Sequence, residues 1–200
     1  MLVRRLWDAL KKLNPLLPTE ALEQAVEQLT KNRGALNPVE AGREIYRLLR
    51  DGVRVTVADE DDSQRTELAR VIDWKNPGNN DFFLASQFWI SGEMYKRRVD
   101  MLAFVNGIPL ALFELKAVHR RLEHAYTRNI SDYKDTIPQL FWYLDFIIVS
   151  NGTESRVRYR VAGVRPTTSN EPRHFGAARQ ECYDLAFAFR TVLAADDDRC

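Results

Sequence analysis

Two acidic residues and one lysine lie within a mostly apolar part of this chain. Asp100 precedes the apolar run 101–105, and Glu114 and Lys116 come at the end of the apolar run 109–115. Burying a charge is costly unless it is paired or binds a metal ion. Two carboxylates are hard oxygen ligands that suit Mg²⁺ or Mn²⁺, and a lysine can hold an attacking water or a phosphate oxygen. We therefore expect a hydrolytic metal site with Asp100 and Glu114 as ligands and Lys116 as a catalytic partner.

Basic residues flank this candidate site on both sides in the sequence. They are Lys96, Arg97 and Arg98 before Asp100, and His119, Arg120 and Arg121 after Lys116. Side chains of this type fit the phosphates of a DNA backbone. Basic triplets are more often solvated faces, and a bare Glu-x-Lys pattern is more often a surface ion pair, so spacing alone leaves these alternatives open.

The two carboxylates can share a site only if two strands meet in a suitable register. Side chains alternate along a strand, so Leu112, Glu114 and Lys116 share one face. A strict two-residue turn at 106–107 would pair Asp100 with Phe113 and place it on the wrong face. We therefore expect a three-residue connection, 105–107, with Gly107 left-handed, which pairs Asp100 with Leu112. A two-residue turn without a bulge would count against a shared site.

Composition places the chain among ordinary globular proteins. Its 200 residues are 45% hydrophobic and 28% charged, and the net charge of +1 creates no global field toward nucleic acid or anionic lipid. The longest apolar run, near 139–149, is too short to span a bilayer, and no secretory signal opens the chain. The two cysteines, Cys182 and Cys200, form neither a disulfide framework nor a zinc site. We expect a cytoplasmic protein with no membrane partner.

Apolar periodicity predicts the elements that must position the site. We expect helices over 2–13, 20–30 (capped by Thr19), 38–49 (with Pro38 in the first turn), 118–134 and 181–194. We expect strands over 53–57, 67–74, 82–90, 98–105, 109–115 and 146–149. Strands between helices predict a layered α/β fold around a buried sheet.

Several segments together resemble the N-terminal nuclease domain of the restriction (R, motor) subunit of type I restriction-modification enzymes. The hairpin reads RVDMLAFVNGIPL followed by FELK (98–110 and 113–116). Segments 76–88, 135–141 and 150–154 are similar to the family's "NP-NNDF…QF", "IPQLF" and "SNGTE" segments. The resemblance covers roughly residues 10 to 157. It implies a three-layer PD-(D/E)xK restriction-endonuclease-like fold with a mixed central sheet flanked by helices.

The resemblance also implies roles for particular residues. It makes Asp100 and Glu114 the ligands of Mg²⁺ (or Mn²⁺) and Lys116 an aid to hydrolysis of double-stranded DNA. The family's Q-x-x-x-Y element falls on Asn129 and Tyr133, where the shorter asparagine replaces glutamine, and these two are additional site candidates. An upstream acidic residue often joins the site in this superfamily, and Glu40 fits that position best.

The family continues into a long ATP-dependent DNA translocase, which this chain does not contain. The sequence has no G-x-x-x-x-G-K-[ST] motif, so ATP would bind only through the missing motor domain. Residues 158–200 do not resemble the family, and a truncated or frameshifted gene would explain them. We divide the chain into an N-terminal helical part (1–50), a nuclease core (51–157) and an atypical tail (158–200).

The resulting functional hypothesis is a Mg²⁺-dependent endonuclease, the N-terminal fragment of a type I restriction subunit. In the intact family it acts on double-stranded DNA within a complex of methylation and specificity subunits. Two alternatives remain: an inactive DNA-binding or docking fragment, and a stand-alone PD-(D/E)xK repair or Holliday-junction nuclease. The activity of the isolated chain stays open at this point.

Overall fold

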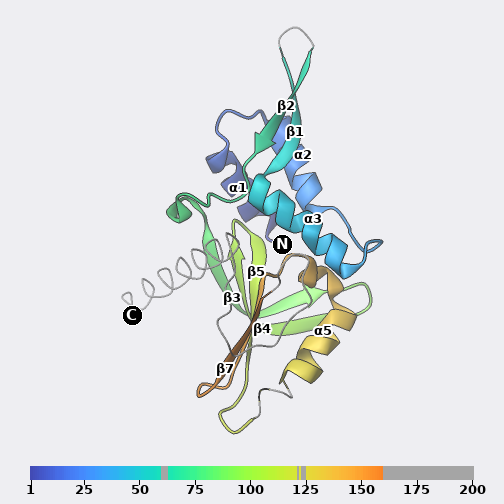
Figure 1. The fold of residues 1–200 in the computed structure, drawn as a ribbon, viewed down its shortest axis with the longest axis vertical. Coiled ribbons are helices and arrows are strands. Elements are labelled where there is room, and N and C mark those ends of the chain that lie inside the picture. Colours follow the sequence, from blue (N-terminus) through green and yellow to red (C-terminus); the bar gives the residue numbers. More distant parts are fainter. Residues whose placement is uncertain (60–62, 121, 123–124, 160–200) are drawn as a thin grey trace, which may run out of the picture.

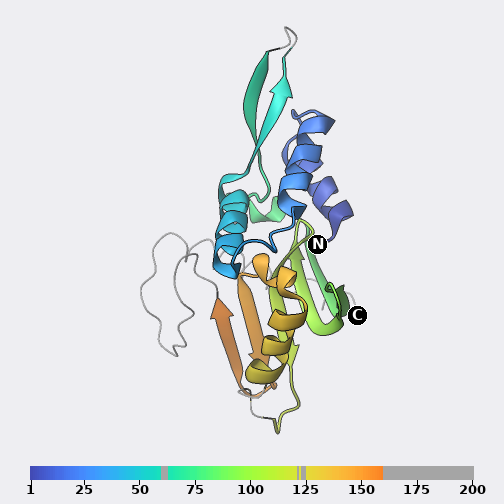
Figure 2. The same cartoon turned by 90° about the vertical axis from the view of Figure 1, so that its right-hand side faces the viewer.

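Three helices and a two-stranded ribbon form one end of the molecule. The computed structural model describes residues 1–59, 63–120, 122 and 125–159. The helices are α1 (Val3–Leu13), α2 (Thr19–Thr30) and α3 (Pro38–Asp51), and the ribbon pairs β1 (Val53–Ala58) with β2 (Gln64–Ala69). Figures 1 and 2 show this ribbon projecting away from the rest of the fold, next to α2.

A five-stranded mixed sheet forms the other end of the molecule. Its strands, in spatial order, are β3 (Phe82–Ser91), β4 (Lys96–Val105), β5 (Ile108–Leu115), β6 (Phe146–Ser150) and β7 (Ser155–Tyr159). Only the β5–β6 pair is parallel among these described strands. Parallel neighbours need a crossover connection, and here it contains the π-helical segment η2 (Ala125–Ile130), helix α5 (Ser131–Thr136) and the 3₁₀ turn η3 (Pro138–Trp142).

Two apolar clusters hold the helices to the sheet. One joins α1, α2, α3 and the ribbon to the start of β5, through residues such as Ile45, Ile108 and Leu110. The other packs α5 and η3 on one face of the sheet, around Phe104 and Leu112. The predicted fold class is therefore confirmed, since this is a mixed α/β fold with helices flanking a mixed sheet. No helix in the described part of the chain has the length and apolarity needed to cross a bilayer.

Most predicted elements are present, with local differences. The Asn37 side chain accepts hydrogen bonds from the amides of Val39 and Glu40 and so caps α3, whereas α2 begins at Thr19 itself. The strand expected over 67–74 is only partly present, because β2 begins at Gln64 and ends at Ala69. The expected helix 118–134 is only partly seen, as η2 and α5. Strand β7 was not predicted, and the expected helix 181–194 lies outside the described residues.

The β4–β5 hairpin differs from the expected three-residue connection. Its turn has two residues, Asn106 and Gly107, whose φ angles of 51° and 77° fit the left-handed positions of a hairpin turn. The register then shifts, since Phe104 lies opposite Pro109 and Ala103 lies opposite Ala111. Leu110 is thus an extra residue in β5. The bulge follows a proline, which has no N–H to donate to the ladder.

The side chain of Asn106 connects the turn to a preceding loop. It is fully buried, accepts a hydrogen bond from the amide of Asp81, and donates to the carbonyl of Val71 and to Oδ1 of Asn80. Asn80 in turn donates to the carbonyl of Asp73. Segments that the resemblance singled out, around 76–82 and 104–107, therefore form one buried polar network.

Helix α1 rests directly on the same turn. The amide of Leu2 donates to the carbonyl of Gly107 over 2.8 Å. A Cβ at position 107 would lie 2.4 Å from the Leu2 carbonyl oxygen and 2.7 Å from the Leu6 nitrogen. Glycine is needed there both for the positive φ and for this close approach.

We predict that Asn106→Gly lowers the free energy of unfolding by roughly 2–4 kcal/mol, because it keeps the left-handed backbone but removes all three side-chain hydrogen bonds of Asn106 in this network. Urea unfolding followed by circular dichroism measures this change. The matched control is Asn32→Gly, since Asn32 makes only an exposed bond to Gly34. A change below about 0.5 kcal/mol for Asn106→Gly would show that the network does not stabilise the fold.

We predict that Asp73 makes the fold sensitive to acid. A hydrogen bond from the Asn79 side chain, helped by the Asn76 amide and the Arg70 charge, holds the pKa of Asp73 below its ordinary value. A carboxyl with a depressed folded-state pKa stabilises the protein above its unfolded pKa, near 4, and loses that contribution as pH falls. The stability gap between the parent and Asp73→Asn should therefore shrink from pH 7 to pH 3 in urea titrations. A gap that is independent of pH contradicts the assignment.

Candidate active site

The β4–β5 register brings Asp100 and Glu114 to neighbouring positions. Met101 lies opposite Phe113, and one further step along both strands sets Asp100 level with Glu114. The expected pairing of Asp100 with Leu112 is therefore wrong, but the shared face is achieved, because the bulge at Leu110 supplies the extra residue. The Asp100 carboxylate accepts a 2.7 Å hydrogen bond from the Leu115 amide, which fixes it against β5.

Glu114 is a buried carboxylate with three donors. Its side chain is 2% exposed. Oε1 accepts hydrogen bonds from Lys116 Nζ, over 2.6 Å, and from Asn129 Nδ2. Oε2 accepts from the Tyr133 hydroxyl over 3.3 Å. A buried charge is tolerated when it is paired and hydrogen-bonded in this way.

Asn129 and Tyr133 reach Glu114 from the crossover segment. Asn129 belongs to η2 and Tyr133 to α5, one helical turn later. The structure therefore brings together both residues of the predicted additional pair, and the short asparagine side chain still contacts the carboxylate. π-Helical turns occur often at functional sites, and the sequence pattern did not predict this one.

Tyr133 is held in its protonated form. Burial raises the pKa of its hydroxyl, and the negative charges of Glu114 and Asp100 raise this pKa further. A protonated phenol donates one hydrogen bond, and here the Glu114 carboxylate and the carbonyl of Arg98 are within reach. Tyr133 thus acts as a neutral donor that orients Glu114.

Lys116 and Asp100 provide the solvent-facing part of this cluster. The Lys116 side chain keeps 24% exposure while its Glu114 partner keeps 2%. Asp100 is half-buried and uses only Oδ2 in its bond to the Leu115 amide. An ammonium group and a carboxylate oxygen therefore remain accessible beside a fixed carboxylate, which suits chemistry on a phosphate and a water molecule.

The β3–β4 ladder is interrupted beside Asp100. Ser86 pairs with Met101 and Phe88 pairs with Val99, but Gln87 and Asp100 between them do not pair. Gln87 has a φ of 51°, which is uncommon for a residue other than glycine. Sequence reasoning did not single out Gln87 as a site residue, because no local pattern marks a left-handed glutamine in a strand.

The predicted DNA-contacting residues have different surroundings. Lys96, Arg98 and Arg120 are exposed, and the Arg98 guanidinium lies 5.9 Å from the centre of the Trp89 ring. Arg97 is instead ion-paired with Asp132 at 2.6 Å, which reduces its capacity for phosphate. His119 is exposed, and Arg121 lies outside the described residues.

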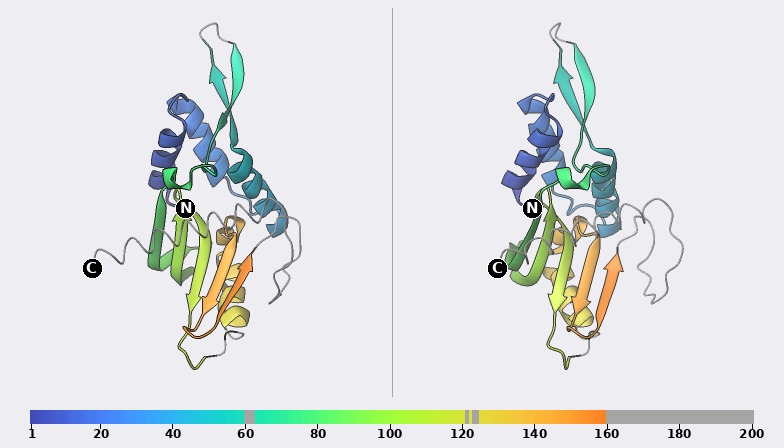
Figure 3. Two further views of the ribbon diagram at one scale, coloured as in Figure 1. Left: turned by 60° about the vertical axis from the view of Figure 1, so that its left-hand side comes forward. Right: turned by 90° about the vertical axis from the view of Figure 1, so that its left-hand side faces the viewer.

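Glu40 is not brought to this cluster. It is exposed in the first turn of α3, and no contact between it and Asp100, Glu114 or Lys116 is seen in the described structure. The start of β5 packs near α3. Glu114 is the second-last residue of β5, and Figure 3 shows that end of the strand pointing away from the helix. A site role for Glu40 finds no support in this placement.

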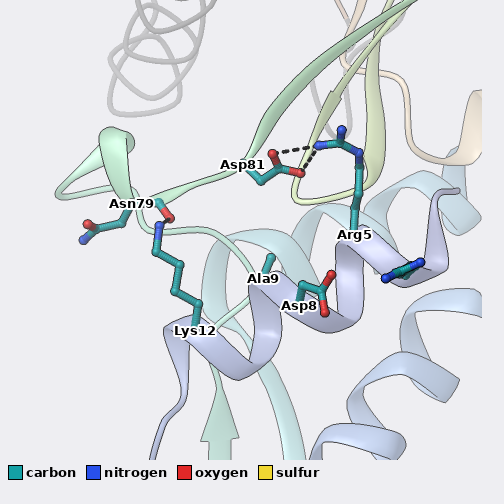
Figure 4. Close-up of a pocket in the computed structure, with 7 residues that line it drawn as sticks. Arg5, Asp8, Ala9, Lys12, Asn79 and Asp81 are labelled. Atoms are coloured by element: carbon teal, nitrogen blue, oxygen red, sulfur yellow. Dashed lines mark hydrogen bonds and ion pairs between the residues drawn. The ribbon is translucent and has the colours of Figure 1, made fainter.

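A separate open hollow lies beside α1. Figure 4 shows it between the helix and the segment leading into β3, lined by Arg4, Arg5, Asp8, Ala9, Lys12, Asn79 and Asp81. Arg5 pairs with Asp81 at 2.7 Å, and Lys12 donates to the Asn79 carbonyl. The Asp81 amide donates to the side chain of Asn106 in the turn after β4, and the six extended residues from Asn106 back to Asp100 span roughly 20 Å. This hollow is distinct from the carboxylate cluster.

The donor set of the cluster fits a hard divalent cation bound mainly through oxygen. Asp100 and Glu114 supply two carboxylates, and in the described part of the chain no group of three or more His, Cys, Asp or Glu side chains could hold a metal. Mg²⁺ commonly uses one or two protein carboxylates and keeps several waters. Two carboxylates beside an accessible lysine therefore suit Mg²⁺ or Mn²⁺, and they do not suit zinc, which favours nitrogen and sulfur ligands.

Comparison with known proteins identifies a matching family and several relatives. The family model described as "Type I restriction enzyme R protein N terminus" matches residues 1–162. The type I restriction enzyme HindI endonuclease subunit of Haemophilus influenzae is 38% identical over 160 residues, covering 78% of this chain and 15% of that protein. The SauMSSORF170P endonuclease subunit of Staphylococcus aureus is 30% identical over 118 residues, covering 58% and 12%.

This chain thus spans about 15% of the length of the first of these relatives. The match includes the helical end, the hairpin with Asp100 and Glu114, and the crossover with Asn129 and Tyr133. The resemblance expected from the sequence is therefore confirmed. The chain belongs to the family of type I restriction enzyme R protein N-terminal domains.

Proposed function

We propose that this domain hydrolyses phosphodiester bonds of double-stranded DNA with Mg²⁺ or Mn²⁺ as cofactor. The observation that carries the proposal is the cluster of Asp100 on β4, Glu114 on β5 and Lys116 directly after β5, with Lys116 Nζ 2.6 Å from Glu114 Oε1. The names of the relatives, which are endonuclease subunits of type I restriction enzymes, support the same reaction class.

In the proposed mechanism, Asp100 and Glu114 would hold the metal ion. When bound, the ion supplies charge neutralisation at the phosphate and a lowered pKa for an adjacent water. Lys116 holds this water, or a phosphate oxygen, in line for attack. The water oxygen forms a new bond to phosphorus, and one P–O ester bond breaks. The proton that the water loses balances the proton that the leaving oxygen takes up. Asn129 and Tyr133 keep Glu114 in position.

The substrate would approach along the exposed cations near the cluster. Lys96, Arg98 and Arg120 are free to contact phosphates, whereas Arg97 is engaged by Asp132. Contacts to phosphates position DNA without reading its sequence. We further propose, from the family alone, that the intact protein works with methylation and specificity subunits and that ATP acts through the additional length that its relatives have.

We predict that Asp100→Asn, Glu114→Gln and Lys116→Met each reduce nicking of supercoiled plasmid by at least about 100-fold in Mn²⁺ or Mg²⁺, because each removes a group that acts on the reacting atoms. Chelation with EDTA should abolish nicking by the parent. The matched control is Glu23→Gln, an exposed glutamate on α2. Parent-like nicking by Asp100→Asn or Lys116→Met would refute the catalytic assignment.

We predict that Tyr133→Phe weakens Mn²⁺ binding by about tenfold while the domain remains folded, because Glu114 Oε2 loses the donor that orients it. Mn²⁺ affinity can be read from the electron paramagnetic resonance signal of the free ion, and folding from circular dichroism. Tyr46→Phe on α3 removes a hydroxyl far from the cluster and should leave the affinity unchanged. Equal affinities for the parent and Tyr133→Phe would exclude a positioning role.

A further inference from the structure

We infer that Gln87 is a positioning residue, and that its left-handed backbone sets the place of Asp100 in the site. This inference rests on the proposed function, because it takes Asp100 to be a metal ligand. Gln87 has a φ of 51°, a strained conformation for a residue with a Cβ. Such strain persists only when the surrounding structure imposes it.

The strained residue lies directly across from Asp100. Pairing between β3 and β4 keeps the same register on both sides of the interruption, from Ser86–Met101 to Phe88–Val99. Gln87 and Asp100 are therefore opposite each other by count, yet no ladder pairing joins them. The interruption falls at the one step of this ladder that contains a proposed ligand.

At this step both strands exchange which of their alternate residues pack in the apolar cluster around Phe104 and Leu112, here called the α5-side cluster. On β3, Phe83 and Ala85 pack in the α5-side cluster before the break, and Phe88 and Ile90 pack in that cluster after it. On β4, Leu102 and Val99 likewise share the cluster although they are three residues apart. In a regular strand these spacings would put the residues on opposite faces. One left-handed residue allows the exchange without changing the register.

The exchange gives Asp100 its position beside β5. Because Asp100 does not pair with β3, its carboxylate is able to turn to the other neighbour, where Oδ2 accepts the Leu115 amide at 2.7 Å. Glu114 is the residue before Leu115 on β5. A regular β3 would pair Asp100 with Gln87 and would set Val99 and Asp100 on opposite faces of β4. Either Val99 would then leave the α5-side cluster or Asp100 would lose its bond to the Leu115 amide.

The side chain of Gln87 does not explain the conformation. It is exposed, and none of the described side chains forms a hydrogen bond with it. The backbone is therefore the functional part of this residue. A residue that accepts left-handed φ should preserve the site, and a β-branched residue, which strongly disfavours it, should not.

The test is a substitution series at position 87 of the full 200-residue chain. Gln87→Gly and Gln87→Asn permit the left-handed backbone, and Gln87→Val opposes it. Ser86→Val is the matched control, since Ser86 is exposed and regularly paired with Met101. If Gln87→Val does not fold, Gln87→Thr places the same β-branch on a polar side chain and carries the same expectation.

Two quantities are measured. The first is amide hydrogen exchange at Leu115 without metal, and the second is the Mn²⁺ dissociation constant from electron paramagnetic resonance. We expect Gln87→Val to raise Leu115 exchange and the dissociation constant by about tenfold or more, and Gln87→Gly, Gln87→Asn and Ser86→Val to match the parent. Parent-like values for Gln87→Val overturn the inference. Impairment of Gln87→Gly equal to that of Gln87→Val also overturns it, because the side chain would then be responsible.

The two measurements separate this inference from the proposed function. If the parent and Asp100→Asn bind Mn²⁺ equally, the metal assignment fails, but Leu115 exchange still decides whether Gln87 positions Asp100. If Asp100→Asn loses Mn²⁺ and Gln87→Val retains it with a protected Leu115 amide, the metal site stands and the positioning role of Gln87 is refuted.

Discussion

The buried amide of Asn106 is the interaction on which the rest of the structure depends. It joins the β4–β5 turn to the loop before β3 through Asn80 and Asp81. The neighbouring Gly107 is in close backbone contact with the start of α1. Leaving a buried amide without hydrogen bonds destabilises the fold, so the geometry of this turn is strongly specified. Because the turn fixes where β4 and β5 start to pair, it also sets the register at the far end of both strands, where the carboxylates lie.

The two ends of the hairpin thus have different roles, one structural and one proposed to be catalytic. Asn80, Asp81, Asn106 and Gly107 hold the fold together at one end, and their segments also carry part of the family resemblance. At the other end, Asp100, Glu114, Lys116 and the crossover residues form the proposed catalytic cluster. A motif that identifies a family is therefore not always the part that performs its chemistry.

Local sequence signals predicted the three N-terminal helices and the hairpin because the cause of each is local. The apolar stripe and the capping Asn37 define α3, and Asn106–Gly107 is a strong turn signal. The residues of the cluster were predicted because they are charged residues within apolar segments. Their register did not, because it depends on the bulge at Leu110. Pro109, which cannot donate to a ladder, was the available signal for that bulge.

Other features had no local signal. The left-handed Gln87 accompanies a change in which β3 residues pack in the α5-side cluster, the π-helical η2 forms where Asn129 meets Glu114, and β7 is a short edge strand that depends on β6 for its pairing. Tertiary contacts decide all three. A sequence read one segment at a time cannot contain that information, whereas the residue types of the cluster are visible in any conformation.

The three donors around Glu114 have a consequence for how a metal ion would couple to folding. The carboxylate already accepts hydrogen bonds from Lys116, Asn129 and Tyr133, so the site would be assembled before an ion arrives, and an ion would have to displace the ammonium group to use Oε1. Metal would then add to stability by mass action alone, about 1.4 kcal/mol at ten times its dissociation constant. This is the opposite of small zinc domains, in which metal binding and folding are one event.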